Sequence, residues 1–341
     1  MRMTWRRQRI HTRHPFKIAR AGASLEGTET ERVIVHLEDR GVLGFGEAAP
    51  SAYYNQSCAS VDATLSHATA LCGGDPHLVI PIVDRLLDKF SDQSAAVAAI
   101  DMALHDWVGK KLGVPVWRLY GLDPTTTPFT SYTIGITEPK ELPARVKEAA
   151  AYKALKVKVG TDRDAEILSI VREHAPTQLI RVDANAGWSP EEASERINAL
   201  ARFNIELVEQ PIAAGQLEAL AAIRHRSPVP IIADEDCVRP ADMPHLVGVV
   251  DGINIKLAKC GGIGQAWTMM RMARHLRLKV MLGCMIETSL GVAAAAQLAS
   301  LADWVDLDSH FLLADDPFDG LTFADGVVKP SHRPGLGVRQ V

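Results

Sequence analysis

Charged residues stand at the ends of successive short apolar segments in the middle of this chain, at nearly even spacing. Lys158 closes ALKVK, and the steps from it to Asp183, Glu209, Asp234 and Lys256 are 25, 26, 25 and 22 residues. That period fits one strand with its following helix. In a (β/α)8 barrel the C-terminal strand ends converge on one mouth. The spacing therefore predicts that these side chains face one another across a single site.

The three carboxylates of this set come from three consecutive predicted strands and are Asp183, Glu209 and Asp234. Converging carboxylates repel one another, so such a cluster persists only where a cation neutralises it. All-oxygen ligation suits Mg²⁺ or Mn²⁺ in six coordination, with open positions for a substrate. Three separate helix caps or surface acids are the alternative, which the regular spacing disfavours. We therefore predict a divalent-metal site.

Two lysines share one face of a predicted strand, because Lys156 and Lys158 are two residues apart. A lysine that acts as a base near pH 7 needs its pKa lowered from about 10.4 by roughly 3, which costs about 4 kcal/mol. One like charge about 4 Å away supplies energy of that order at an effective dielectric of about 20. Lys156 beside Lys158, with a divalent cation, meets this requirement. Lys256 is the second candidate base, and Lys259 is set aside because its side-chain parity is opposite.

Three further acids follow the last two apolar segments. Glu287 ends the seventh segment in CMIETSLG, where it either reaches the site or caps the next helix. Asp306 and Asp308 form the DLD of the eighth segment and share one strand face. As a pair they suit a cation or an ammonium group, although loop acids are common. No GxSxG, HxH or HExxH pattern accompanies them, so a serine hydrolase has little support.

The pattern of elements predicts an α/β fold in three parts. Residues 1–50 alternate with period 2, and residues 58–72 and 94–113 have helical spacing. After residue 121, eight apolar segments alternate with helical stretches, which implies a parallel sheet closed into a barrel. The predicted parts are an α+β capping domain (1–120), a modified (β/α)8 TIM-like barrel (121–316) and a segment that returns to the capping domain (317–341).

Bulk composition excludes several classes of protein. The 341 residues are 47% hydrophobic and 23% charged, and the net charge of −4 gives no sign of a nucleic-acid partner. Five scattered cysteines without a CxxC pair fit a reducing cytoplasm better than a disulfide framework. No stretch approaches about 18 uncharged apolar residues, so no membrane partner is expected. We expect a cytoplasmic protein with a small-molecule partner. The composition is compatible with a homo-oligomer.

Five motifs resemble the enolase superfamily, in its muconate-cycloisomerase-like subgroup. They are, in this order, KVKVG, DANAGW, VEQP, ADED and INIKLAKCGG, and the resemblance covers nearly the whole chain. It implies that Asp183, Glu209 and Asp234 bind Mg²⁺. It also implies that Lys158 and Lys256 are the acid/base pair. Members with a histidine base on the later strands are excluded, because Lys256 occupies that place.

Within that subgroup, DLD and CMIETSLG resemble the dipeptide epimerases. In that family two aspartates hold the ammonium of the dipeptide's N-terminal residue. A mobile first-domain loop carries a basic residue near the substrate, and Arg20 in FKIARAG stands at its place. Ser309-His310 departs from the small residue and proline that relatives often have. The substrate-binding residues implied by the resemblance are Lys156, Arg20, Glu287, Asp306 and Asp308.

The implied activity is a 1,1-proton transfer at the α-carbon of a dipeptide's C-terminal residue. One lysine removes the proton, Mg²⁺ stabilises the ene-diolate, and the other lysine returns a proton to the opposite face. This chemistry is known for the superfamily and rests here on the resemblance. The expected substrate is L-Ala-D/L-Glu or a related L-Ala-Xaa dipeptide. Alternatives are an o-succinylbenzoate synthase or N-acylamino acid racemase, and, in another class, a barrel that binds a ligand without turnover.

Overall fold

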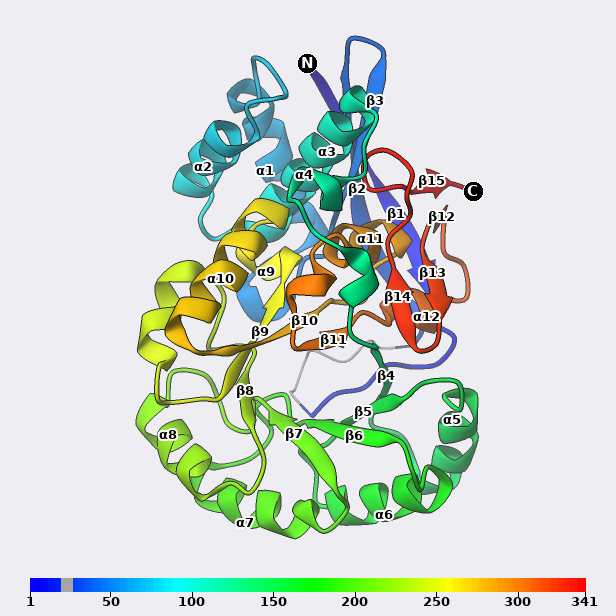
Figure 1. The fold of residues 1–341 in the computed structure, drawn as a ribbon, viewed down its shortest axis with the longest axis vertical. Coiled ribbons are helices and arrows are strands. Elements are labelled where there is room, and N and C mark those ends of the chain that lie inside the picture. Colours follow the sequence, from blue (N-terminus) through cyan, green and yellow to red (C-terminus); the bar gives the residue numbers. More distant parts are fainter. Residues whose placement is uncertain (20–26) are drawn as a thin grey trace.

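The N-terminal part of the protein is an antiparallel sheet covered by helices. The computed structural model describes residues 1–19 and 27–341, so Arg20 lies outside the described residues (Figure 1). The sheet has the order β1 (Arg2–His11), β2 (Glu29–Asp39) and β3 (Val42–Ala48). Helices α1 (Cys58–Leu71) and α3 (Ser94–Leu112) pack on the sheet, and α2 (Val79–Lys89) packs on these two helices. The predicted α+β architecture of this part is confirmed.

Local sequence explains how two of these helices begin and end. Helix α3 starts at Ser94, and Gly113 follows its last residue in a left-handed conformation with φ 71°, which suits glycine. Helix α2 was not predicted, and its segment VIPIVDRLLDK contains Pro81. That proline stands in the first helical turn, where its missing N–H removes no intrahelical hydrogen bond.

The predicted barrel is confirmed, and each of the eight apolar segments contains one strand. The parallel sheet runs in chain order from the first strand to the eighth. A parallel bridge between Thr130 and Val305 joins its two edges, so the barrel is nearly closed. Its strands are β4 (Ser131–Ile134), β5 (Ala154–Lys158), β6 (Leu179–Asp183), β7 (Ile205–Glu209), β8 (Ile231–Ala233), β9 (Gly252–Lys256), β10 (Lys279–Gly283) and β11 (Trp304–Asp306).

Helices α5 to α8 form part of an outer ring around these strands (Figure 1). After β8 the connection has only a 3-10 helix, η4 (Pro240–Leu246), and α11 is buried along its whole length. The α-helices are α4 (Val116–Leu119), α5 (Leu142–Glu148), α6 (Asp164–His174), α7 (Pro190–Ala201), α8 (Leu217–Arg226), α9 (Leu257–Cys260), α10 (Ile263–Leu276), α11 (Ser289–Ala296) and α12 (Ser309–Leu312). The other 3-10 helices are η1 (Ala52–Tyr54), η2 (Pro124–Thr126), η3 (Pro139–Glu141) and η5 (Ala299–Leu301).

Strand β3 and helix α3 approach each other closely because glycines leave room. A Cβ atom added to Gly46 would lie 1.9 Å from the carbonyl oxygen of Ala99. We expect Gly46→Ala to lower the free energy of unfolding by about 1–3 kcal/mol or more, since rigid backbone blocks the new methyl group. Urea unfolding measures this. The control is Gly73→Ala, whose new methyl would lie 3.7 Å from its nearest neighbour; equal effects of the two changes would contradict the packing argument.

The C-terminal residues form short strands beside the N-terminal part (Figure 1). The pairs are β12 (Phe318–Asp319) with β15 (Arg339–Gln340), and β13 (Thr322–Ala324) with β14 (Val327–Lys329). The amide of Leu336 donates to Asp106 Oδ1 on α3 at 2.8 Å. The carbonyl of Gly335 accepts from the amide of Val116 at 3.0 Å. The proposed domain limits, 1–120, 121–316 and 317–341, stay a prediction.

Two general features complete the description of the fold. Within residues 1–19 and 27–341, no helix is long and apolar enough to cross a membrane. All five cysteines carry free thiols.

Candidate active site

The ends of neighbouring strands place the predicted acids and lysines at one level of the barrel. Lys158 of β5 is in register with Asp183 of β6, and Asp183 is in register with Glu209 of β7. Asp234 directly follows β8, and Lys256 closes β9. The structure therefore brings together all five of the residues whose even spacing predicted a site.

Strand β5 directs its two lysines toward the acids. Lys156 and Lys158 are 2% and 7% exposed, while Val157 between them packs in the apolar core. Lys156 Nζ lies 3.0 Å from Asp183 Oδ2 and 2.7 Å from Glu209 Oε2. Lys158 Nζ donates a hydrogen bond to Asp183 Oδ2 at 2.7 Å. The alternating side-chain parity of a strand thus produces the arrangement.

The second candidate base approaches from the other side of the barrel. Lys256 Nζ donates to Asp234 Oδ2 at 2.8 Å. Strand β9, which carries Lys256, is four strands away from β5 in the eight-stranded sheet. Lys158 and Lys256 therefore stand on opposite sides of the acids.

Burial and close charges shift the pKa values of the acids in different directions. Burial opposes ionisation of Asp183, but Lys156 and Lys158 hold its pKa well below the usual range. Burial also opposes ionisation of Asp234, but the charges of Lys256 and Lys259 keep its pKa low. Burial and the charge of Asp183 raise the pKa of Glu209 to about 7. Glu209 is thus the acid of the trio that the nearby lysines stabilise least.

The same carboxylates act on the lysines. Burial favours the neutral amine of Lys156, but Asp183, Asp306 and Glu209 outweigh it and raise its pKa. Burial likewise disfavours the ammonium of Lys256, and Asp234 raises its pKa above the ordinary value. Lys156 and Lys256 are therefore held in the charged form while they pair with the acids.

The three acids fit a divalent cation by their chemistry. Within the described residues, no cluster of three or more histidine, cysteine or acidic side chains surrounds a metal position. Lysine ammonium groups lie between the acids and supply the positive charge instead. Glu209 Oε2 is buried without a hydrogen bond, although Lys156 Nζ lies 2.7 Å away, and Asn185 Oδ1 is also a buried oxygen without one. Carboxylate and amide oxygens of this kind are suitable ligands for Mg²⁺.

The two acids of the eighth segment have different partners. Ser131 Oγ donates to Asp306 Oδ1 at 2.6 Å, and Lys156 Nζ donates to Asp306 Oδ2 at 2.7 Å. Asp308 accepts from the amide of Thr133 through Oδ2 at 2.5 Å, and its Oδ1 accepts no hydrogen bond from the described residues. Burial and the charge of Asp306 raise the pKa of Asp308 to about 7. Asp308 is therefore the member of the pair that is free to meet a ligand.

Glu287 is buried beside the site without lining its cavity. Its Oε1 accepts from the amide of Met285 at 3.1 Å. Burial and the charge of Glu47 raise the pKa of Glu287 to about 8. It does not cap α11 either, since Thr288 is the residue that caps that helix. The structure thus gives Glu287 no contact with the space in which a substrate would lie.

Lys259, which the parity argument set aside, contacts the site directly. Its Nζ donates to Asp234 Oδ1 and to the backbone oxygen of Asp234, both at 2.6 Å. Strand β9 ends at Lys256, and the short helix α9 turns Lys259 back toward Asp234. The alternation of side chains along a strand therefore did not apply to Lys259. The sequence signal that could have identified it is the K-x-x-K spacing of Lys256 and Lys259, shortly before a Gly-Gly pair.

Two amide side chains also position the acids. Asn254 Nδ2 donates to Glu209 Oε1 at 2.8 Å. Gln210 Oε1 accepts from the amide of Asp234 at 2.9 Å, and Gln210 itself has a positive φ of 34°. Such a conformation costs on the order of 1–3 kcal/mol and often occurs at functional sites. The sequence showed both residues inside motifs but gave no sign of these contacts.

A cavity of about 280 Å³ lies over the lysines and acids. The barrel contributes the two candidate bases and Asp308 to its walls, and the N-terminal part contributes aromatic side chains such as Tyr53 and Tyr54. A cavity of this size suits a small molecule rather than a macromolecule. The site therefore lies between the barrel mouth and the N-terminal part.

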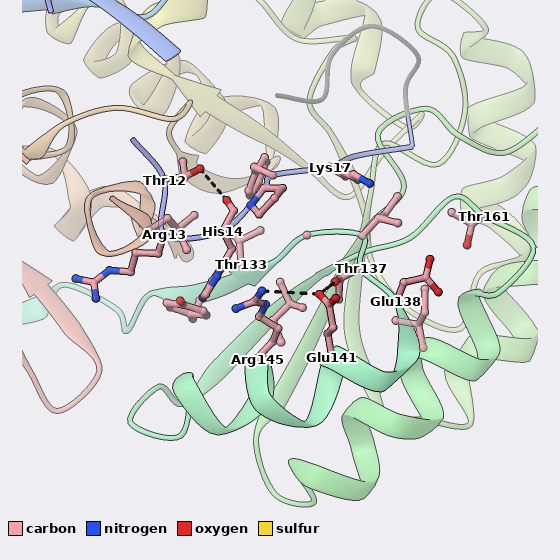
Figure 2. A pocket seen from close by; sticks show the side chains of 18 of the residues that line it. Thr12, Arg13, His14, Lys17, Thr133, Thr137, Glu138, Glu141, Arg145 and Thr161 are labelled. Carbon is pink, nitrogen blue, oxygen red and sulfur yellow. Dashed lines mark hydrogen bonds and ion pairs between the residues drawn. The ribbon is translucent and has the colours of Figure 1, made fainter. Parts of the chain in front are cut away.

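A second cavity of about 330 Å³ adjoins the first at the edge of the barrel (Figure 2). Residues 12–17 cover it, and residues of β4 and α5 form its floor. Some of its polar groups bond to one another: Thr12 Oγ1 donates to the carbonyl of His14 at 2.7 Å, and Arg145 lies 3.8 Å from Glu141. None of the predicted acids or bases lines the described walls of this cavity, so the smaller one is the candidate active site.

Comparison with known families agrees with this architecture. Residues 140–340 match the model described as enolase C-terminal domain-like. Residues 1–121 match the model of the mandelate racemase / muconate lactonizing enzyme N-terminal domain. The chain therefore belongs to the mandelate racemase / muconate lactonizing enzyme family of the enolase superfamily. The family predicted from the motifs is thus confirmed.

Individual members of the family resemble the chain along its whole length. The L-Ala-D/L-Glu epimerase of Bacteroides thetaiotaomicron is 38% identical to this chain, and the matched region covers 100% of this chain and 88% of that protein. The dipeptide epimerase of Enterococcus faecalis, solved with Mg and L-Leu-L-Tyr, is 33% identical with a TM-score of 0.90 and 98% coverage of both chains. The N-succinyl Arg/Lys racemase of Bacillus cereus is 28% identical with a TM-score of 0.91, covering 100% of this chain and 96% of that one.

Proposed function

We propose that this protein is a Mg²⁺-dependent dipeptide epimerase, an isomerase that inverts the α-carbon of a dipeptide's C-terminal residue by 1,1-proton transfer. The observation that carries the proposal is the placement of Lys158 and Lys256 on opposite sides of one cavity. Inversion requires a proton acceptor on one face of the carbon and a donor on the other. The 38% identical relative that is named an epimerase supports this class of reaction.

Asp183, Glu209 and Asp234 are the residues that we propose to hold Mg²⁺. When bound, the ion would act as a Lewis acid toward the substrate carboxylate and would compete with the lysines for the three acids. Lys158 and Lys256 would exchange protons with the α-carbon from opposite faces. Lys156, which Asp306 holds in place at 2.7 Å, would stabilise negative charge that develops between them.

Asp308 gives the proposal its dipeptide character. Asp308 lines the same cavity as the two bases, and its Oδ1 accepts no hydrogen bond from the described residues. We propose that it receives the free ammonium of the dipeptide, with Asp306 adding negative charge behind it. An L-Ala-D/L-Glu or related L-Ala-Xaa dipeptide is the proposed substrate, in the cytoplasm. Arg20 is proposed to contact it, and Glu287 to act from behind the cavity wall through its hydrogen bond with the amide of Met285. A homo-oligomer stays open.

An N-acetylated dipeptide should be a much poorer substrate than the free dipeptide. Acetylation removes the ammonium and leaves the buried carboxylate of Asp308 without its partner, a penalty of about 2–5 kcal/mol. That range corresponds to a loss in kcat/KM of roughly thirtyfold or more. Steady-state kinetics on L-Ala-L-Glu and its N-acetyl form give the ratio.

The variant Asp308→Asn should lose activity on the free dipeptide. The ratio of kcat/KM between the free and the N-acetylated dipeptide should therefore be smaller than in the wild type. The control is Asp325→Asn, at an exposed turn outside the cavity lining, which should leave both rates unchanged. A wild type that prefers N-acetyl or N-succinyl amino acids would overturn the dipeptide proposal and support an N-acylamino acid racemase instead.

A further inference from the structure

Arg32 is a buried arginine of the N-terminal sheet that lines the candidate active site. It lies on β2, is 6% exposed, and forms the cavity wall together with Thr30 and Ile286. The sequence patterns gave it no role, because β2 belongs to the part of the chain that precedes the barrel. Its position in the wall is a consequence of how the N-terminal part covers the barrel mouth.

Neutral oxygens hold the guanidinium of Arg32 in place. Its Nε donates to the carbonyl of Ile286, and its Nη1 donates to Thr30 Oγ1 at 3.0 Å and to the carbonyl of Glu31 at 2.5 Å. Its Nη2 donates to no acceptor within residues 1–19 and 27–341. These contacts fix the direction of the side chain and leave the Nη2 group of the guanidinium available to a ligand.

No carboxylate in the described part of the chain forms an ion pair with Arg32. The two acids whose charge acts on it are Glu47 and Glu287. Glu47 instead accepts from the amide and hydroxyl of Thr288 and from the amide of Gly291. Burial raises the pKa of Glu47, and burial together with the charge of Glu47 raises that of Glu287 to about 8, so Glu287 balances the charge of the arginine only in part near neutral pH.

A buried arginine without an ion pair is unusual. Arginine does not deprotonate in proteins, and its burial is ordinarily compensated by a paired carboxylate or phosphate. Burial lowers the pKa of Arg32, which reflects the unfavourable desolvation of its charge. Arg32 thus presents a fixed positive charge to the cavity with no anion of the described chain in contact with it.

The groups of the proposed substrate suggest which anion would meet this charge. The α-carboxylate of a dipeptide is directed to the acid trio and its metal, and the ammonium to Asp308. These contacts leave the two side chains of the dipeptide without an assigned binding partner. A carboxylate on one of them would form a charge-assisted hydrogen bond with Arg32.

We propose that Arg32 is a specificity-determining residue that binds a side-chain carboxylate of the substrate, so that the site favours acidic dipeptides. This inference rests on the proposed dipeptide epimerase function. The carboxylate has two sources, an acidic first residue or an acidic second residue. Because Arg32, Lys256 and Asp308 line one cavity of about 280 Å³, both positions of a short dipeptide lie within the same small space.

The test compares acid and amide substrates of equal shape. Kinetics on L-Ala-L-Glu against L-Ala-L-Gln examine the second residue, and L-Glu-L-Ala against L-Gln-L-Ala examine the first. We expect the wild type to prefer the acid over its amide about tenfold or more in kcat/KM in at least one pair. Arg32→Met should remove that preference, whereas Arg32→Lys should retain part of it because the charge remains.

Two controls separate a role in recognition from a role in folding. Arg9→Met, at an exposed position of the neighbouring strand, should leave the acid preference unchanged. Turnover of the neutral L-Ala-L-Ala by Arg32→Met should stay within about threefold of the wild type, a ratio that a merely structural defect would not preserve.

Two results would overturn the inference. One is a wild type that does not distinguish acid from amide in either pair, and the other is an acid preference that survives Arg32→Met. If L-Ala-L-Ala turns over in both cases, the proposed function stands and only the role of Arg32 fails. If no dipeptide turns over at all, the proposed function fails and the inference fails with it.

Discussion

Lys158→Ala and Lys256→Ala should each abolish epimerisation. Each lysine is expected to serve one face of the α-carbon, and the loss of a positioned acid or base reduces kcat by about 10²–10⁴-fold. The two side chains stand four strands apart around the barrel and both line the cavity, so neither can replace the other. Activity of each variant on a free dipeptide, measured by chiral chromatography, gives the effect. Lys147→Ala, at an exposed position of α5, should behave as wild type.

The same variants should differ in isotope exchange. A variant that lacks one base keeps the other, which can still remove and return the proton on its own face. In D2O each variant should therefore exchange the α-hydrogen of one substrate enantiomer, and the two variants should prefer opposite enantiomers. If both exchanged the same enantiomer, the assignment of the two lysines to opposite faces would be wrong.

Removal of the metal should have an equally large effect. Exhaustive chelation with EDTA should abolish turnover, and added Mg²⁺ should restore it, because Asp183, Glu209 and Asp234 would otherwise remain paired with lysines. Full activity of protein shown by elemental analysis to hold no metal would remove the argument from the three acids.

Glu209→Gln is the sharpest single change at this cluster. Glutamine keeps the volume and an oxygen for Asn254, which bonds to Glu209 at 2.8 Å, but removes one negative charge. Mg²⁺ affinity measured by titration calorimetry should fall about tenfold or more, which is about 1.4 kcal/mol. Asp162→Asn, at a fully exposed side chain, is the matched control. An unchanged affinity of Glu209→Gln would contradict its assignment as a ligand.

Periodicity in the sequence predicted the main part of the fold and of the site for one physical reason. A barrel repeats the same strand end eight times, so residues that face each other in space recur at regular intervals along the chain. Lys158, Asp183, Glu209 and Asp234 were found in this way, and the structure brings them together.

Lys259 and Asp306 show where this reasoning stopped. The parity argument for Lys259 assumed that the strand continues past Lys256, but helix α9 begins at Leu257 and turns the side chain inward. Asp306 ends β11, whereas Asp308 lies beyond the strand at the start of α12. The partners of Asp306, Ser131 and Lys156, come from residues 175 and 150 positions earlier, and Asp308 bonds to the amide of Thr133. A strand pattern gives no information about such distant partners.

Arg32 could not have been found from the sequence for a different reason. A single arginine in a strand of an antiparallel sheet is ordinarily a solvated surface charge. It lines the cavity because β2 approaches the loop at Ile286, and this contact joins residues 254 positions apart. Contacts between the capping sheet and the barrel depend on the packing of two folded parts, which local patterns do not specify.

Incorporation of deuterium at the α-carbon tests the central claim most directly. The wild-type protein with Mg²⁺ is incubated in D2O with a library of free dipeptides, and mass spectrometry follows each one. The account predicts that at least one dipeptide gains a single deuterium, located on the α-carbon of its C-terminal residue, while its stereochemistry equilibrates. If no dipeptide in the library gained deuterium, or if the label entered only N-acyl amino acids, the assignment as a dipeptide epimerase would be contradicted.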